Sequence, residues 1–196
     1  MMAVLERPFF ERDTLTVAHQ LLGKKLVRRR DGETLSGMIV ETEAYIGQED
    51  SACHASRGRT PRTEVMFGPP GRAYVYFVYG MHYMLNIVTE AEGRPCAVLI
   101  RAIEPLSGQT TMARLRGKAN HNLTNGPARL CQALDIDKTF NGWDLTAADA
   151  LWLEDFRPIA EADIRRGPRI GIRYARPADR QAPWRFWVHG NSHVSR

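Results

Sequence analysis

The chain has 196 residues, and its 27 Lys and Arg residues outnumber its 22 Asp and Glu residues, so the formal net charge is +5 at pH 7. This length supports one hydrophobic core, and we expect a single domain over residues 1–196. The positive charge favours a polyanionic partner without proving one, and the lack of any apolar run near 20 residues argues against a membrane span.

The first third of the chain predicts a helix, a hairpin and a loop. Asp13 can cap a helix that ends near Leu22, with Gly23 as its stop signal. Residues 25–29 and 34–46 are predicted to pair as strands around Asp31-Gly32, a dipeptide that accepts positive φ. Residues 47–71 keep no sustained period, and we interpret them as a long ordered loop of the kind that is often functional.

The remaining elements indicate an antiparallel sheet with short helices. Strands are predicted at 73–78, 83–89 and 97–102 as a meander, followed by helices at 110–116 and from Asn125 to about Leu134. Short strands at 151–153, 169–174 and 184–188 would complete the sheet. The start of the second helix, with Arg129 one turn in, could hold a phosphate, although a merely well-capped helix explains the segment equally well.

Glu43 is the candidate catalytic residue. The strand period of two places Glu41, Glu43 and Tyr45 on one face. A carboxylate beside an anomeric carbon can stabilise the positive charge left by a departing base and take a proton from the attacking water. A glycoside hydrolase would need carboxylates on both sides of the scissile bond, which two neighbours on one strand face argue against.

The aromatic residues suggest a base-binding pocket and a wedge. Tyr45 and Tyr76 could stack on a purine, and His54 could complete the pocket, although each would otherwise be an ordinary sheet aromatic or a structural histidine. Tyr79 precedes Gly80 at a predicted hairpin tip, outside the face that Tyr74 and Tyr76 share. An exposed aromatic there is typical of a wedge that fills the gap left by an extruded base.

Basic residues cluster in two stretches of the sequence. Residues 105–134 carry no acid and include Arg114, Arg116, Lys118 and Arg129, and a second basic stretch covers 165–185. Solvated surface arginines would give the same pattern, but the aromatic hairpin favours nucleic acid.

Other chemistries are disfavoured. Lysines are few and lie outside the pocket-forming segments, which disfavours a Schiff-base mechanism. The histidines show no metal-ligand spacing, and the three cysteines show no Cys-x-x-Cys pair, so we expect no metal, no cofactor and a reducing, cytoplasmic location.

Segments in a fixed order resemble the alkyladenine family of 3-methyladenine DNA glycosylases. They are Val40-Glu41-Thr42-Glu43-Ala44-Tyr45, Arg59-Thr60-Pro61-Arg62, Met66-Phe67, Tyr74-Val75-Tyr76, Tyr79-Gly80-Met81, Asn86, Arg101-Ala102-Ile103-Glu104-Pro105 and residues 126–134. The resemblance runs from about Leu21 to Val194. It implies a single α+β domain, with a mixed α/β content, whose curved antiparallel sheet presses a hairpin into the DNA minor groove.

The resemblance also implies roles for individual residues. Glu43 matches the general base and Arg101 an arginine near the attacking water. The residues matching the base pocket are Tyr45, His54, Tyr76 and Asn86, where the asparagine disfavours an exocyclic 2-amino group. Tyr79 matches the intercalating residue. The residues that we assign to the DNA backbone are Arg59, Thr60, Arg62 and Arg129.

The implied reaction is hydrolytic release of 3-methyladenine, 7-methylguanine, hypoxanthine or ethenoadenine from double-stranded DNA, which leaves an abasic site in an intact strand. We expect a monomer that associates with the nucleoid through DNA. The sequence departs from the family pattern at Thr63, Glu64, Arg72 and Met84, none of which is a proposed catalytic group. Two alternatives stay open: a non-catalytic nucleic-acid-binding module of the same fold, and a small-molecule or carbohydrate hydrolase using Glu41 with Glu43.

Overall fold

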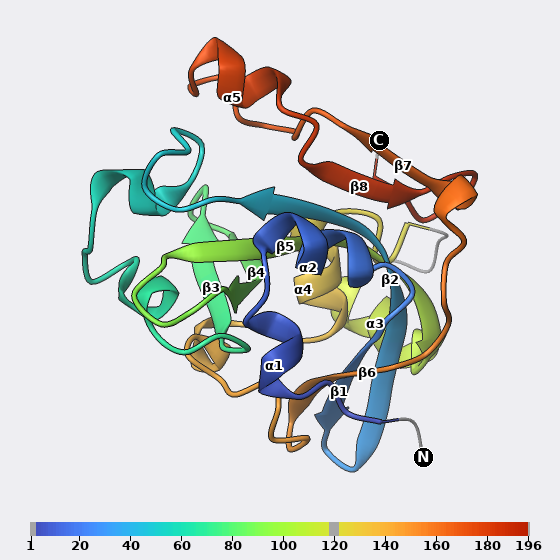
Figure 1. The fold of residues 1–196 in the computed structure, drawn as a ribbon. Helices are drawn as coiled ribbons and strands as arrows, with labels where there is room; N and C mark the ends of the chain where they lie inside the picture. The colour runs from blue at the N-terminus through green and yellow to red at the C-terminus, as the bar shows by residue number, and fades with distance from the viewer. Residues whose placement is uncertain (1–2, 118–121, 196) are drawn as a thin grey trace.

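The computed structural model of the protein describes residues 3–117 and 122–195, which build an eight-stranded sheet (Figure 1). Its strands run in the order β3-β4-β5-β2-β1-β6, while β8 pairs with β2 and with β7, and every pairing is antiparallel. The strands are β1 (Lys25–Arg30), β2 (Glu33–Tyr45), β3 (Ala73–Val78), β4 (His82–Thr89), β5 (Cys96–Ser107), β6 (Leu151–Glu154), β7 (Ile164–Gly167) and β8 (Arg185–Val188). The predicted α+β class is confirmed.

Short helices surround the sheet. They are α1 (Arg7–Phe10), α2 (Thr14–Gln20), α3 (Gln109–Arg116), α4 (Pro127–Ala133) and α5 (Pro177–Gln181), with 3₁₀ turns at His54–Arg57, Glu64–Phe67, Lys138–Phe140 and Glu161–Asp163. The Asp13 side chain accepts a hydrogen bond from the Thr16 amide and caps α2 as predicted. Buried residues of α2 and α4 share the main hydrophobic core with the sheet.

β2 is the strand that positions the site. Its first half pairs with β1 across the predicted turn, where Asp31 and Gly32 both have positive φ, and its second half pairs with β5 and β8. The register with β5 shifts around Glu41, as at a β-bulge. Thr42 donates to the Ala18 carbonyl of α2, so Glu41 and Glu43 extend from the opposite face of the strand.

One predicted strand is wrong. Residues 169–174 form bends and turns, and the strand of this region is β7, earlier in the chain. Pro168 has no N–H to donate to a ladder and Gly171 has φ +82°, so the segment leaves the sheet at this point. The strand predicted at 97–102 continues to Ser107, past Pro105.

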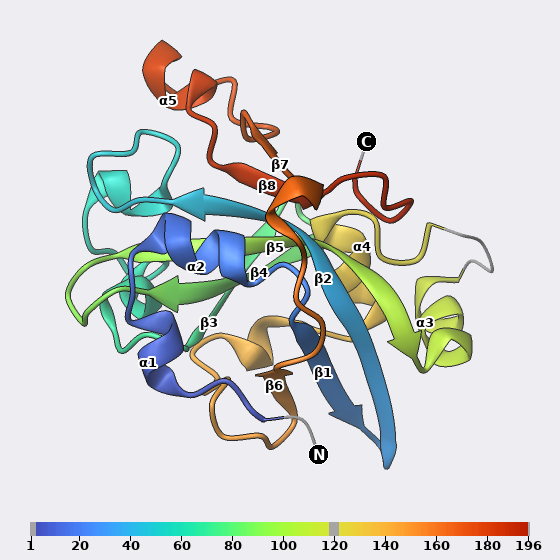
Figure 2. The ribbon, with the colours of Figure 1, turned by 45° about the vertical axis from the view of Figure 1, so that its right-hand side comes forward.

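The segment from β7 to β8 lies outside the main body of the sheet. Figures 1 and 2 show α5 projecting on the same side of the molecule as the loop of residues 47–71. That loop is ordered, as predicted, through its two 3₁₀ turns.

Candidate functional site

Four residues predicted for the base pocket line one cavity. Its walls come from β2, the 47–71 loop, β3, β4, β5 and the segment after β7. The residues lining it are Tyr45, Ala52, Cys53, His54, Met66, Tyr74, Tyr76, Asn86, Ala97 and Tyr174. The structure therefore brings Tyr45, His54, Tyr76 and Asn86 together, although 41 positions separate the first of them from the last in the sequence.

Aromatic rings face each other across this cavity. The His54 ring meets Tyr76 edge-on, with centroids 4.5 Å apart, and the Tyr74 and Tyr76 rings lie 5.5 Å apart. The Arg62 guanidinium lies 5.2 Å from the centroid of the Tyr76 ring. The Asn86 Nδ2 donates to the Tyr74 carbonyl at 3.1 Å, which fixes the orientation of its amide.

The His54 imidazole is neutral at pH 7. Burial, followed by the positive charges of Arg62 and Arg57, lowers the pKa of His54 to about 4. Its Nδ1 lies 2.9 Å from the Tyr74 hydroxyl, and burial raises the pKa of that phenol to about 12, so both groups keep their neutral forms. His54 therefore presents its remaining nitrogen, Nε2, as a single donor or acceptor.

Glu43 is fully buried beside the cavity and is not part of its lining. The Tyr45 hydroxyl donates to one carboxylate oxygen at 2.8 Å, and the Ile170 amide donates to the other at 2.7 Å. Burial first, and then the charge of Glu43, raises the pKa of Tyr45, so the phenol stays protonated as a donor. The carboxylate is thus linked to the cavity through the hydroxyl of a cavity-wall tyrosine.

Arg101 connects two buried carboxylates. Its guanidinium lies 3.2 Å from Glu41 and 3.3 Å from Glu43. Burial opposes its charge, but the carboxylates of Glu43 and Glu41 outweigh burial and raise the pKa of Arg101. Glu41 also accepts from Arg185 and from the Ser195 amide, so it holds the C-terminal segment against β2.

Tyr79 stands at the tip of the β3–β4 hairpin with 80% of its surface exposed. Its φ is +55° and that of Gly80 is +70°, a pair of values typical of a tight type I′ turn. Non-glycine residues rarely adopt positive φ, so the turn holds a large aromatic ring in solvent at some conformational cost. The geometry matches the predicted exposed tip.

The residues predicted to contact the DNA backbone lie in two places. Arg59 is exposed and makes two hydrogen bonds to Glu64, at 2.8 and 2.6 Å, while Thr60 bonds with Thr63 inside the loop. Arg129, on α4, donates to Asn125 at the start of its own helix, and Figure 2 shows α4 away from the 47–71 loop. Lys118, which belongs to the predicted basic stretch, lies outside the described residues.

Sequence reasoning missed some of the site. Tyr74 could have been found, because the strand period places it on the same face as Tyr76. Tyr174 carried no such signal, because the segment that contains it was predicted as a strand. Tyr174 is 69% exposed, and its hydroxyl donates to the Ala52 carbonyl at the cavity wall.

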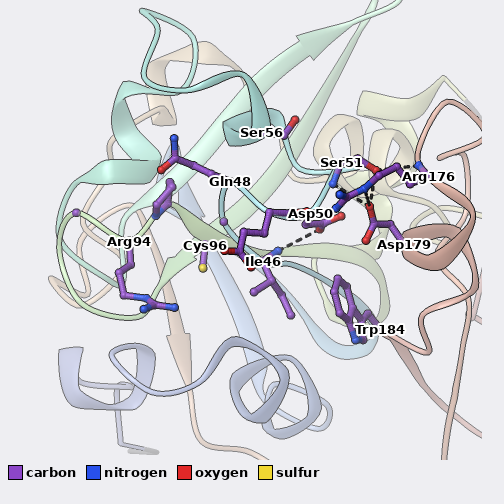
Figure 3. Close-up of a pocket in the computed structure, with 14 residues that line it drawn as sticks. Ile46, Gln48, Asp50, Ser51, Ser56, Arg94, Cys96, Arg176, Asp179 and Trp184 are labelled. Carbon is purple, nitrogen blue, oxygen red and sulfur yellow. Dashed lines mark hydrogen bonds and ion pairs between the residues drawn. The ribbon is translucent and has the colours of Figure 1, made fainter.

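A larger cavity of about 1010 Å³ is lined by a different set of residues, which includes none of the proposed catalytic groups (Figure 3). It opens between residues 46–51, the β4–β5 turn and the α5 segment. Within residues 3–117 and 122–195, no cluster of three or more His, Cys, Asp or Glu side chains could hold a metal ion. No helix in the same ranges has the length and apolar character to cross a bilayer.

Comparison with known proteins places the chain in a family. A family model described as methylpurine-DNA glycosylase matches residues 8–192. A relative from Carboxydothermus hydrogenoformans is 52% identical over 98% of this chain and 99% of its own length, and one from Methanocella arvoryzae is 49% identical over 100% and 97%. A third, from Myxococcus xanthus, is 47% identical over 98% and 93%, and all three carry the provisional name 3-methyladenine DNA glycosylase. The chain therefore belongs to the methylpurine-DNA glycosylase family.

Proposed function

We propose that the protein flips alkylated and deaminated purines out of duplex DNA and hydrolyses their N-glycosidic bonds, leaving an abasic site. Family membership makes it a DNA glycosylase, which is a hydrolase of N-glycosyl bonds. The named substrate of the relatives is 3-methyladenine, and we extend the range to hypoxanthine, ethenoadenine and 7-methylguanine. The protein would act as a monomer, because one chain supplies both the cavity and the Glu43 network.

The observation that carries this proposal is the link from the buried Glu43 carboxylate, through the Tyr45 hydroxyl, to an aromatic cavity. A purine stacked in that cavity would place its sugar toward Glu43. As the base leaves, positive charge develops on the sugar, and the carboxylate stabilises it and takes a proton from water. Arg101 lies within ion-pair distance of the same carboxylate and would orient that water.

Selectivity would come from the cavity wall and from DNA deformation. The amide of Asn86 is held by the Tyr74 carbonyl and cannot turn away from an exocyclic 2-amino group, so guanine would fit poorly where hypoxanthine fits. Tyr79 would enter the duplex and fill the gap left by the flipped nucleotide, which lowers the cost of unstacking. Damaged bases that pair weakly flip at lower cost.

Replacement of Glu43 by Gln tests the chemistry. We expect Glu43→Gln to bind a hypoxanthine duplex within a few-fold of wild type and to lower single-turnover base release by at least about 100-fold, because the amide cannot accept the proton of water. Release is measured by alkaline cleavage of the abasic strand. Glu92→Gln, at an exposed position of the β4–β5 turn, is the matched control and should keep the wild-type rate. Wild-type release by Glu43→Gln would contradict the assignment.

The alternative is a non-catalytic nucleic-acid-binding module. It would bind lesion duplexes with the same steep dependence on salt, because backbone contacts release counterions, but it would leave every base attached. Base release by wild-type protein, with ethenoadenine and 7-methylguanine duplexes as further substrates, separates the two. A carbohydrate hydrolase using both carboxylates is disfavoured, since Glu41 already bonds Arg101, Arg185 and Ser195.

A further inference from the structure

The Arg169 side chain is completely buried beside the candidate site, and its donors reach three separate parts of the chain. The guanidinium bonds both oxygens of Asp50, at 2.5 and 2.9 Å, and also the carbonyls of Ala44 and Asp179. Such a bidentate contact with a carboxylate restricts the orientation of the guanidinium more than a single hydrogen bond does. Arg169 therefore ties the end of β2, the 47–71 loop and α5 together.

The same guanidinium lies against two aromatic rings. Its central carbon is 4.7 Å from the centroid of Tyr45 and 4.8 Å from that of Trp184. Burial opposes its charge, but the hydrogen bonds and charge of Asp50 outweigh burial and raise the pKa of Arg169. A permanent cation is thus held against the tyrosine that forms one wall of the cavity.

The residue after Arg169 contacts the proposed general base. The Ile170 amide donates to one Glu43 oxygen at 2.7 Å, and the hydroxyl of Tyr45 donates to the other. Ile170 follows Arg169 directly in the chain, and the ring of Tyr45 lies against the Arg169 guanidinium. A displacement of Arg169 would therefore move both hydrogen bonds that orient the carboxylate.

The Asp50 side of this arrangement is itself anchored. Asp50 accepts from the Ile46 and Ala52 amides, and the neighbouring Ser51 donates to Asp179. Figure 3 shows Asp50 and Ser51 beside Asp179, with Trp184 nearby. A buried ion pair contributes little net stability, because desolvation offsets its attraction. What this pair supplies is a fixed geometry.

We propose that Arg169, held by Asp50, is a positioning residue for base excision: it sets the Ile170 amide and the Tyr45 ring so that Glu43 faces the sugar of a flipped nucleotide. This inference rests on the proposed function. It gives the segment after β7 a role in base excision, although the Arg169 side chain itself would not touch the substrate.

The test is single-turnover excision from a hypoxanthine duplex by Arg169→Lys at increasing enzyme concentration. Lysine keeps the positive charge but cannot form the bidentate contact with Asp50 or stack on the rings of Tyr45 and Trp184 in the same way. We expect the plateau rate to fall about tenfold or more, since small displacements of catalytic groups are costly, while half-saturation changes less than about threefold. Loss of folded protein alone would raise the half-saturating concentration and leave the plateau unchanged.

Two further variants complete the experiment. Trp184→Leu removes one stacking ring and keeps the ion pair, so its plateau rate should fall about threefold, and it decides the question if Arg169→Lys does not fold. Arg7→Lys makes the same substitution at the Arg7–Asp144 pair, away from the cavity, and should keep the plateau rate. Plateau rates within twofold of wild type for folded Arg169→Lys, or for Trp184→Leu, overturn the proposal. Wild-type protein that releases no base would instead refute the proposed function.

Discussion

Glu41 and Glu43 are two residues apart on one strand and equally buried, yet their partners separate their roles. Glu41 accepts from Arg185 and from the Ser195 amide, which belong to the C-terminal segment. Glu43 accepts from Tyr45, a residue of the cavity wall. A residue's chemistry here follows from its donors rather than from its position on the strand, because the shared face alone would make the two carboxylates equivalent.

The lowered pKa of His54 predicts how the stability of the protein depends on pH. Its folded-state pKa of about 4 lies below the ordinary value of 6.5, so the unfolded chain binds a proton first and stability falls as pH drops from about 6.5 through 4. The His54→Gln variant lacks this titration. We expect the difference in unfolding free energy between wild type and variant to shrink as pH falls, by at most about 1.4 kcal/mol per pH unit.

Urea unfolding of both proteins at pH 7.5 and pH 4.5 measures this difference. All other titrating groups are common to wild type and variant and cancel to first order. An unfolding free-energy difference that stays constant between the two pH values would show that His54 titrates alike in the folded and unfolded chains.

At the scale of elements, the β3–β4 hairpin combines an unfavourable turn residue with an exposed ring. Tyr79→Asn should remove the wedge and also suit the positive φ, since asparagine tolerates that region better than tyrosine. We expect thermal stability to stay equal or rise slightly while affinity for a lesion duplex falls about tenfold. Calorimetry and a fluorescence titration check the two opposite changes.

Tyr79→Ala separates the loss of the ring from the relief of the backbone. It should weaken DNA binding as Tyr79→Asn does, without the gain in stability. Unchanged lesion affinity in both variants would mean that the hairpin tip does not enter the duplex. Excision at saturating enzyme should persist in both, because Glu43 keeps its partners.

Basic residues are grouped along the sequence, at 105–134 and 165–185, and the net charge of the whole molecule is +5, so we expect DNA binding to depend on salt. Arg62→Gln and Arg129→Gln should each lower the slope of log affinity against log salt by about 0.9, if each side chain neutralises one phosphate. Arg29→Gln is the control, since Arg29 is exposed on β1 and Figures 1 and 2 place β1 away from the 47–71 loop. Slopes that match wild type in all three variants would remove Arg62 and Arg129 from the DNA interface.

Arg59 differs from Arg62 and Arg129, because its guanidinium is already paired with a carboxylate, that of Glu64, through two hydrogen bonds. Both side chains are exposed, so the pair contributes little to stability. A contact between Arg59 and a DNA phosphate would therefore have to replace its two hydrogen bonds to Glu64.

The sequence by itself predicted every strand except β7, together with the Asp31-Gly32 turn and the common face of Glu43 and Tyr45, because these depend on local period and turn chemistry. It also predicted the pocket residues, through a resemblance carried by short motifs. Only the tertiary structure decided that Tyr174 lines the cavity, that Arg169 packs against Tyr45 and that Glu41 anchors the C-terminal segment. Those contacts join residues more than 100 positions apart, such as Arg169 with Asp50 and Glu41 with Ser195. No local period encodes them, since they exist only when the packed chain brings buried charges within reach of their partners.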